Sequence, residues 1–148
     1  MSKPQTRSQR LMGLALELVQ EVANQYPDKD HPVRKIYGGL CHNFPVLVRT
    51  CGLCQAVAFS VDKAGAADSD SNDEKDRAKA HHLHLQHIAR VLADSYDESI
   101  STDNLLDCIL GASLEEYIRY TRQVLAAWVY FRRFARSILK VEPGGERQ

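Results

Sequence analysis

Near the C-terminus, residues 113–141 have the pattern of one long amphipathic helix. It begins with Ser113 and Glu116, an S-x-x-E capping box in which each side chain bonds to the other residue's backbone N–H. Its apolar residues recur at three- and four-residue intervals and form one stripe: Tyr117, Val124, Trp128, Phe131, Ala135 and Ile138. A helix of this length with one apolar face must pack against other helices, unless the chain also supplies strands.

Helical spacing recurs along the rest of the chain, and no segment alternates apolar and polar residues as a strand does. We expect helices over residues 8–26, 33–42, 43–64, 75–94, about 101–110 and 113–141. The boundary before Asn43 rests on its suitability as an N-cap and on Pro45, which the first turn of a helix tolerates. The acidic stretch 66–77 is predicted to be a mobile loop, and residues 142–148 a flexible tail. The sequence therefore predicts an all-α, compact single-domain bundle of five to six helices over residues 1–148.

A chain of 148 residues can bury a sizeable core without disulfides or metals. The core is expected to include the largest apolar residues of the predicted stripes: Leu14, Leu18, Leu47, Phe59, Leu85, Ile88, Leu106, Trp128 and Phe131. No apolar stretch approaches the roughly 20 residues of a membrane-spanning helix, and the N-terminal residues do not resemble a secretory signal. We therefore expect a cytoplasmic protein with no membrane contact and with reduced cysteines.

Two groups of residues invite a metal or redox interpretation. Cys51 and Cys54 form a C-x-x-C pair, but the predicted helix 43–64 places them mid-helix, where we interpret them as small buried hydrophobes. The histidine-rich segment 81–87 is interpreted as a solvated face of partly charged imidazoles. We expect no metal and no cofactor. The alternative is a metal-binding helical bundle that uses four ligands: Cys51, Cys54, His81 and His84.

No catalytic motif is recognisable: the chain has no G-x-S-x-G, no glycine-rich phosphate loop, no H-E-x-x-H and no paired E-x-x-H. We expect that the protein is not an enzyme and has no catalytic residues. Its net charge is zero, but the segments 1–65, 66–112 and 113–148 carry +3, −6 and +3. On the last predicted helix a basic face adjoins the apolar stripe, with Arg119 at its edge: Arg122, Arg132, Arg133, Arg136 and Lys140. Arginine suits phosphate and carboxylate alike, so this pattern predicts an anion-facing helix and no specific anion.

Three stretches together resemble a known family. They are Tyr37-x-x-Leu40-x-x-x-Phe44-Pro45-x-Leu47, Gly52-Leu53-x-Gln55-Ala56-x-Ala58-Phe59-x-x-x-Lys63, and Tyr117-x-x-x-Thr121-x-x-Val124-x-x-x-Trp128-x-x-x-Arg132-Arg133-Phe134-Ala135. In this order, over roughly residues 7–140, the chain resembles the small helical subunit, numbered the fifth, of the Cmr-type (type III-B) CRISPR effector complex. The acidic stretch 66–77 and the histidine cluster are not part of the family pattern.

The resemblance implies a non-catalytic subunit for antiviral defence, which stacks with further copies of itself in a filament beside the other Cmr-type subunits. Together these subunits hold a guide RNA paired to a target RNA. Because base pairing reads the sequence, the subunit needs Lys and Arg along phosphates and no base-reading groups. We expect phosphate contacts from a subset of six residues: Arg49, Lys63, Arg119, Arg122, Arg133 and Arg136. The alternatives are the small subunit of another CRISPR effector class, such as type III-A, and a helical adaptor that binds only protein.

Overall fold

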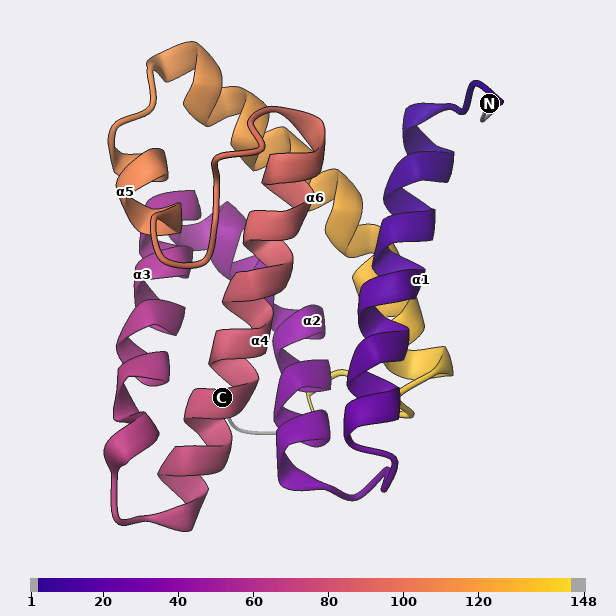
Figure 1. Cartoon of the computed structure of the whole chain (residues 1–148), viewed down its shortest axis with the longest axis vertical. Coiled ribbons are helices and arrows are strands. Elements are labelled where there is room, and N and C mark those ends of the chain that lie inside the picture. The colour runs from indigo at the N-terminus through magenta and orange to yellow at the C-terminus, as the bar shows by residue number, and fades with distance from the viewer. Residues whose placement is uncertain (1–2, 145–148) are drawn as a thin grey trace.

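Six α-helices and one short 3-10 helix form the fold of residues 3–144, the part of the chain that the computed structural model describes (Figure 1). They are α1 (Arg7–Gln25), α2 (Pro32–Cys51), α3 (Leu53–Ala64), η1 (Gly65–Asp68), α4 (Asn72–Ser95), α5 (Leu105–Leu110) and α6 (Leu114–Ser137). These residues contain no strand, so the predicted all-α bundle of five to six helices is confirmed. None of their helices is long and apolar enough to cross a membrane.

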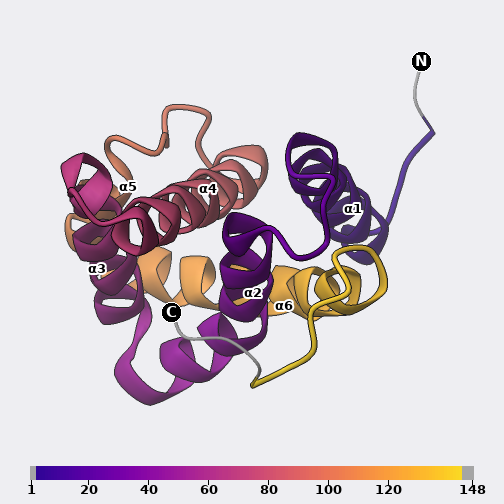
Figure 2. The ribbon, with the colours of Figure 1, turned by 90° about the horizontal axis from the view of Figure 1, so that it is seen from below.

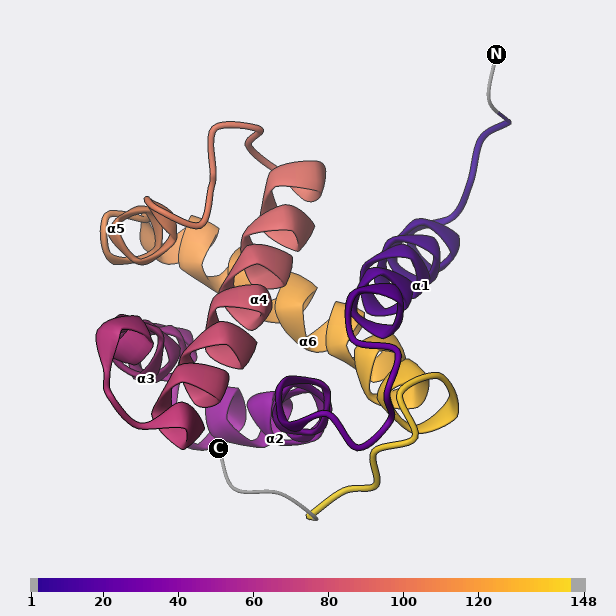
Figure 3. The same ribbon diagram turned by 60° about the horizontal axis from the view of Figure 1, so that its bottom comes forward.

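The first four long helices run alternately down and up in Figure 1, in the spatial order α3, α4, α2, α1 from left to right. The last helix, α6, crosses behind them from upper left to lower right (Figure 1), and the tilted view of Figure 3 shows it passing α4, α2 and α1 in turn. It packs against all three of these helices. The arrangement leaves one side of α6 outside the bundle, which matters for the functional site below.

Local capping signals define the starts of the first and last helices. At α6, the Glu116 backbone N–H donates to Ser113 Oγ (3.1 Å) and the Ser113 N–H donates to Glu116 Oε1 (2.8 Å), so the predicted capping box is confirmed. Thr6 and Gln9 form an equivalent box at α1. Because these signals lie within four residues of sequence, the predicted start of α6 is confirmed and that of α1 is correct to one residue.

The predicted helix boundary before Asn43 is wrong. Helix α2 continues through Pro45 to Cys51, and the break falls at Gly52, whose φ of 87° and ψ of 161° suit glycine alone. Proline in a helix interior costs a hydrogen bond. Here, however, Phe44, Pro45 and Val48 are buried, so the packing of this face against the bundle outweighs the local cost of Pro45.

The predicted loop 66–77 is shorter in the structure. Residues 65–68 form η1, and α4 begins at Asn72 because Ser71 Oγ accepts a hydrogen bond from the Glu74 N–H, with acidic residues in its first turn. At the other end of the chain, α6 ends at Ser137 and not near residue 141. Of the predicted tail 142–148, residues 145–148 lie outside the described part of the chain.

The chain after α6 folds back over α2 as a short C-terminal strap, residues 138–144. Lys140 has a φ of 64°, and the turn places Val141 against Gly38, where an added Cβ would lie 2.5 Å from Val141 Cγ2. The His42 Nε2–H donates to the Val141 carbonyl over 2.7 Å. The absence of a side chain at Gly38 therefore allows the strap to seat on α2.

Most of the predicted core is buried. Trp128 and Phe131 are fully buried and stack with their ring centroids 4.2 Å apart at the centre of the bundle. Four other predicted core residues are also buried: Leu14, Leu18, Leu85 and Ile88. The remaining three, Leu47, Phe59 and Leu106, are only partly buried, so the prediction is wrong for their full burial.

Candidate nucleic-acid interface

The outward side of α6 carries five exposed arginines, which we call the basic face: Arg119, Arg122, Arg132, Arg133 and Arg136. Arg132, Arg133 and Arg136 are exposed and border a shallow hollow of about 320 Å³, with His42 of α2 and Val129 also on its wall. Residues three and four apart on a helix are neighbours on its surface. The three guanidinium groups can therefore approach the same anionic chain.

Most of this positive charge has no partner within the described residues. Arg136 Nε lies 3.1 Å from Glu142 Oε2, and both side chains are exposed. Neither Arg132 nor Arg133 takes part in a hydrogen bond or ion pair there. A guanidinium group presents planar donors that match phosphate oxygens, and it stays charged at physiological pH. Among the described residues, the guanidinium groups of Arg132 and Arg133 are therefore available to an anion, whereas that of Arg136 already contacts a carboxylate.

The basic face continues toward the start of α6 through two of the predicted residues. Arg122 is exposed and has no ion pair within the described part of the chain. Arg119 NH2 lies 3.7 Å from Glu115 Oε2, one turn earlier, and both side chains are exposed. An exposed pair of this kind contributes little and exchanges readily for another anion.

Arg49 and Lys63 occupy different places. Arg49 is exposed in the last turn of α2, seven residues after His42 and therefore on the same stripe of that helix, about 10 Å further along. It lies on a helix that packs against α6. Lys63 lies in the last turn of α3, where it borders a separate hollow with Asp62 and Glu74, and its Nζ lies 5.6 Å from the Phe59 ring centroid. The structure thus places Lys63 away from the basic face.

Sequence reasoning omitted one residue of the face from its candidate set. Arg132 lies at the edge of the predicted basic arc, and the structure puts it on the same hollow as Arg133 and Arg136. Its place on the basic face of the predicted helix is the sequence signal that identifies Arg132 as a candidate. His42 was not among the predicted residues, because its approach to α6 depends on the folding of the C-terminal strap, which leaves no local sequence pattern.

Exposed apolar side chains lie among these arginines. Leu114, Ile118 and Val129 are 76%, 41% and 53% exposed on α6. Apolar residues mixed with arginine are typical of surfaces that proteins bury against each other. The outward side of α6 therefore has features of both an anion-binding and a protein-binding surface.

The histidine cluster is buried, which corrects the predicted solvated face. His81 and His84 are completely buried and His87 is 4% exposed, while His82 alone lies on the surface. Helical spacing could have shown this, because it places His81 and His84 on the same stripe of α4 as Ile88. The polarity of imidazole suggests a solvated face, but the helical spacing of these histidines is the signal that the structure follows.

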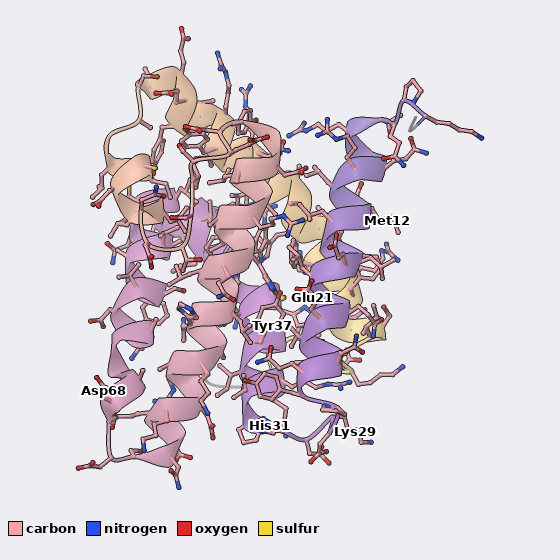
Figure 4. The ribbon with its side chains drawn as sticks, viewed as in Figure 1. Met12, Glu21, Lys29, His31, Tyr37 and Asp68 are labelled. Atoms are coloured by element: carbon pink, nitrogen blue, oxygen red, sulfur yellow. The ribbon has the colours of Figure 1, made fainter. Side chains whose placement is uncertain are left out.

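Hydrogen bonds and burial determine the state of these imidazoles. His81 Nδ1 lies 3.0 Å from Ser60 Oγ, and His87 Nδ1 lies 2.6 Å from Tyr37 Oη. Figure 4 shows Tyr37 in the middle of the bundle. His84 has no partner for either ring nitrogen within the described residues. Burial lowers the pKa of His81 and of His87 to about 4, and the pKa of His84 well below its usual 6.5.

The cysteine interpretation also changes. Cys51 is exposed at the end of α2, and Cys54 is partly buried in the first turn of α3, so the pair spans a helix junction and is not mid-helix. The Cys54 N–H donates to Tyr117 Oη over 3.1 Å. Within residues 3–144, no three His, Cys, Asp or Glu side chains lie close enough to hold a metal ion, so the four alternative ligands are not brought together.

Comparison with known proteins identifies the family. The family model described as CRISPR-associated protein (Cas_Cmr5) matches residues 7–138. The protein named CRISPR system Cmr subunit Cmr5 from Thermus thermophilus is 34% identical over 135 residues, which cover 91% of this chain and 97% of that protein. A crystal structure of a CRISPR-associated Cmr5 family protein from the same organism matches with a TM-score of 0.65 and 33% identity, covering 93% of this chain and all of that one. This chain, with its helical bundle and basic α6, belongs to the Cmr5 family of CRISPR-associated proteins.

Proposed function

We propose that this chain is a non-catalytic subunit of a type III-B (Cmr) CRISPR effector complex, in which its basic face contacts the phosphate backbone of bound RNA. Membership of the Cmr5 family supports its place among other Cmr subunits, because a relative that covers most of the chain is named as such a subunit. The observation that supports the RNA contact is that Arg122, Arg132 and Arg133 are exposed on α6 and have no hydrogen bond or ion pair within the described residues.

The chemistry of the face suits a phosphate backbone and not base recognition. Its charged groups are guanidinium forks spaced along one helix, and such groups fix the register of a nucleic acid without reading sequence. In a guide–target duplex, base pairing reads the sequence. A subunit that supports the duplex therefore needs positive charge along the phosphates, and the exposed arginines on the outward side of α6 support this role.

A single copy should bind RNA weakly, because it meets few phosphates and its net charge is zero. Stacked copies in a filament would add their contacts through high effective concentration. Tight binding is thus a property of the assembly in this proposal, and weak binding by the isolated chain is consistent with it.

A second candidate function is a purely protein-binding adaptor. The exposed apolar residues Leu114, Ile118 and Val129 favour it, because burying them against a neighbouring subunit removes apolar surface from water. In that case the arginines of α6 would pair with carboxylates of the neighbour. The two functions differ in what happens when the arginines lose their charge.

The test uses a complex reconstituted from all Cmr subunits, with wild-type chain or the double variant Arg132→Gln/Arg133→Gln. The matched control is Lys79→Gln/Arg90→Gln, which also removes two positive charges. Both residues are exposed on α4, a helix that lies in front of α6 in Figure 1. We expect the double variant to enter the complex in normal stoichiometry and to capture target RNA about tenfold or more weakly. The control should capture RNA as the wild type does.

Two results would contradict the RNA contact. Loss of the subunit from the complex in the double variant would assign the arginines to protein contacts and favour the adaptor function. Normal stoichiometry with unchanged RNA affinity would show that neither arginine faces RNA.

A further inference from the structure

An open pocket lies between α2 and α3, with α4 at its base, and the function proposed above does not use it. These three helices pack against one another (Figure 2). The pocket has a volume of about 360 Å³, within the range of about 300–1,000 Å³ for small-molecule sites. Leu40 and Phe44 of α2 form part of its buried wall.

This pocket is lined mainly by apolar side chains, with Asn43 and Thr50 among its polar residues, and its mouth is incompletely covered. Val46 is 56% exposed, and Leu47 and Phe59 are partly buried although their helical spacing assigns them to the core. Each of these side chains keeps apolar surface in contact with water, which is unfavourable unless another molecule covers it. Leu47 and Phe59 are therefore less fully packed than the buried apolar residues of the same helices.

The inner end of the pocket holds an unsatisfied polar group. His84 lines the pocket, is completely buried, and has no hydrogen-bond partner at Nδ1 or Nε2 within the described residues. Its neighbours on α4 each have at least one partner: His81 Nδ1 bonds to Ser60, although its Nε2 has no partner within the described residues, and His87 Nδ1 bonds to Tyr37. Aromatic edges hold the His84 ring in place, with the Phe44 centroid at 4.6 Å and the Trp128 centroid at 5.5 Å. Buried polar atoms nearly always have a partner, and His84 is the pocket-lining residue that lacks one at both ring nitrogens within the described residues.

We propose that this pocket binds a small, uncharged ring compound whose single hydroxyl or ring N–H forms a hydrogen bond with His84. A neutral imidazole has one donor and one acceptor nitrogen. A hydroxyl can pair with either nitrogen, whereas a ring N–H can donate only to the acceptor nitrogen. Burial keeps the imidazole neutral, because it lowers the pKa of His84. The ring of the ligand packs between Leu47 and Phe59 at the mouth.

The lining determines what the pocket excludes. No Asp, Glu, Lys or Arg side chain lines it among the described residues, so a charged ligand would lose its hydration without compensation. A wholly apolar compound would cover the walls but leave His84 unsatisfied. The preferred class is therefore phenol-like or indole-like, and the inference does not depend on the RNA contact proposed for α6.

Trp128 provides a direct readout, because it is the single tryptophan of the chain and its ring packs against His84. Titration of the wild-type protein with para-cresol should give a saturable change in tryptophan fluorescence. Toluene, which has the same shape without the hydroxyl, should bind about tenfold more weakly, as expected for one lost hydrogen bond to a buried group.

Two variants separate the parts of the proposal. His84→Phe keeps an aromatic ring but removes both nitrogens, so para-cresol should then bind no better than toluene. Leu47→Phe adds bulk at the mouth, keeps Trp128 as the single tryptophan, and should weaken the binding of both compounds. The matched control Leu125→Phe changes a partly buried leucine on α6, which does not line the pocket, and should leave binding unchanged.

Equal affinity of wild-type protein for para-cresol and toluene would overturn the role of His84, and this comparison needs no variant to fold. Absence of saturable binding, or binding that Leu47→Phe leaves unchanged, would overturn the site itself. Binding to the isolated chain that disappears in the reconstituted complex would mean that a neighbouring subunit fills the pocket, which also contradicts a small-molecule site.

Discussion

Three buried imidazoles make the stability of the core depend on pH. The pKa of His81 and of His87 is about 4 in the folded chain and the pKa of His84 is lower than usual, whereas in the unfolded chain each is near 6.5. Burial is the first cause in each case. Positive groups near the cluster add to it: Lys63 and Arg77 beside His81, and Arg90 beside His87.

The first prediction follows from the sign of these shifts. Below about pH 6.5 the unfolded chain takes up protons that the folded chain refuses, so stability is complete above that pH and falls as the pH drops toward about 4. Each histidine contributes a slope of up to about 1.4 kcal/mol per pH unit. Urea unfolding between pH 7 and 4.5 measures the slope. His84→Phe should make it shallower, and His82→Phe, at an exposed position, should not.

A single buried arginine joins the ends of two helices. The Arg34 guanidinium donates to the backbone carbonyls of Tyr26 and Pro27, just after α1, and of Ile138 and Leu139, just after α6, over 3.0–3.2 Å. These carbonyls belong to helix ends, where no intrahelical donor is available. One side chain therefore satisfies acceptors that are far apart in the sequence.

The second prediction is that Arg34→Met lowers the free energy of unfolding by roughly 3 kcal/mol or more, because it leaves several part-buried carbonyls without a donor. Arg34→Lys should recover only part of this loss, since one ammonium group cannot reach both helix ends. Arg136→Met is the matched control at an exposed position near the same end of α6, and it should cost less than about 1 kcal/mol. Equal effects at the two positions in urea unfolding would contradict this account of Arg34.

At the scale of the helices, local signals predicted some boundaries and tertiary packing decided the others. The capping box at Ser113 identified the start of α6 because its residues act on neighbouring backbone groups. Pro45 predicted a boundary that does not exist, because the burial of its helix face favours a continuous α2. Gly52 is the real break, and nothing in its immediate sequence distinguishes it from Gly38 or Gly39, which lie inside α2.

The third prediction concerns the C-terminal strap. Gly38→Ala places a Cβ 2.5 Å from Val141 Cγ2 and should lower stability by roughly 1–3 kcal/mol through overpacking. Val141→Ala removes the opposing methyl groups. The double variant should therefore be less destabilised than the sum of the single variants, with a coupling energy of at least about 0.5 kcal/mol. Strict additivity in thermal or urea unfolding would mean that the strap moves away without cost.

At the scale of the whole molecule, the sequence predicted the fold class and the basic side of α6 but not the contents of the interior. Helical spacing places Arg122, Arg133 and Arg136 on one surface whatever the rest of the chain does. The unsatisfied His84 and the hollow bordered by His42 depend on how distant segments meet. Charge also separates at this scale, since the acidic segment 66–112 forms α4 and α5 while the basic face belongs to α6.

The salt dependence of target RNA binding by the reconstituted Cmr complex tests the central claim most directly. Each phosphate contact contributes a slope of roughly 0.7–0.9 to the decline of log affinity with log salt concentration. We predict that Arg132→Gln/Arg133→Gln in this subunit weakens binding at low salt and makes the slope shallower by more than about one unit, equally for RNAs of unrelated sequence. Lys79→Gln/Arg90→Gln should leave the slope unchanged. An unaltered slope in the α6 variant, with the subunit still in the complex, would contradict an RNA contact by the basic face.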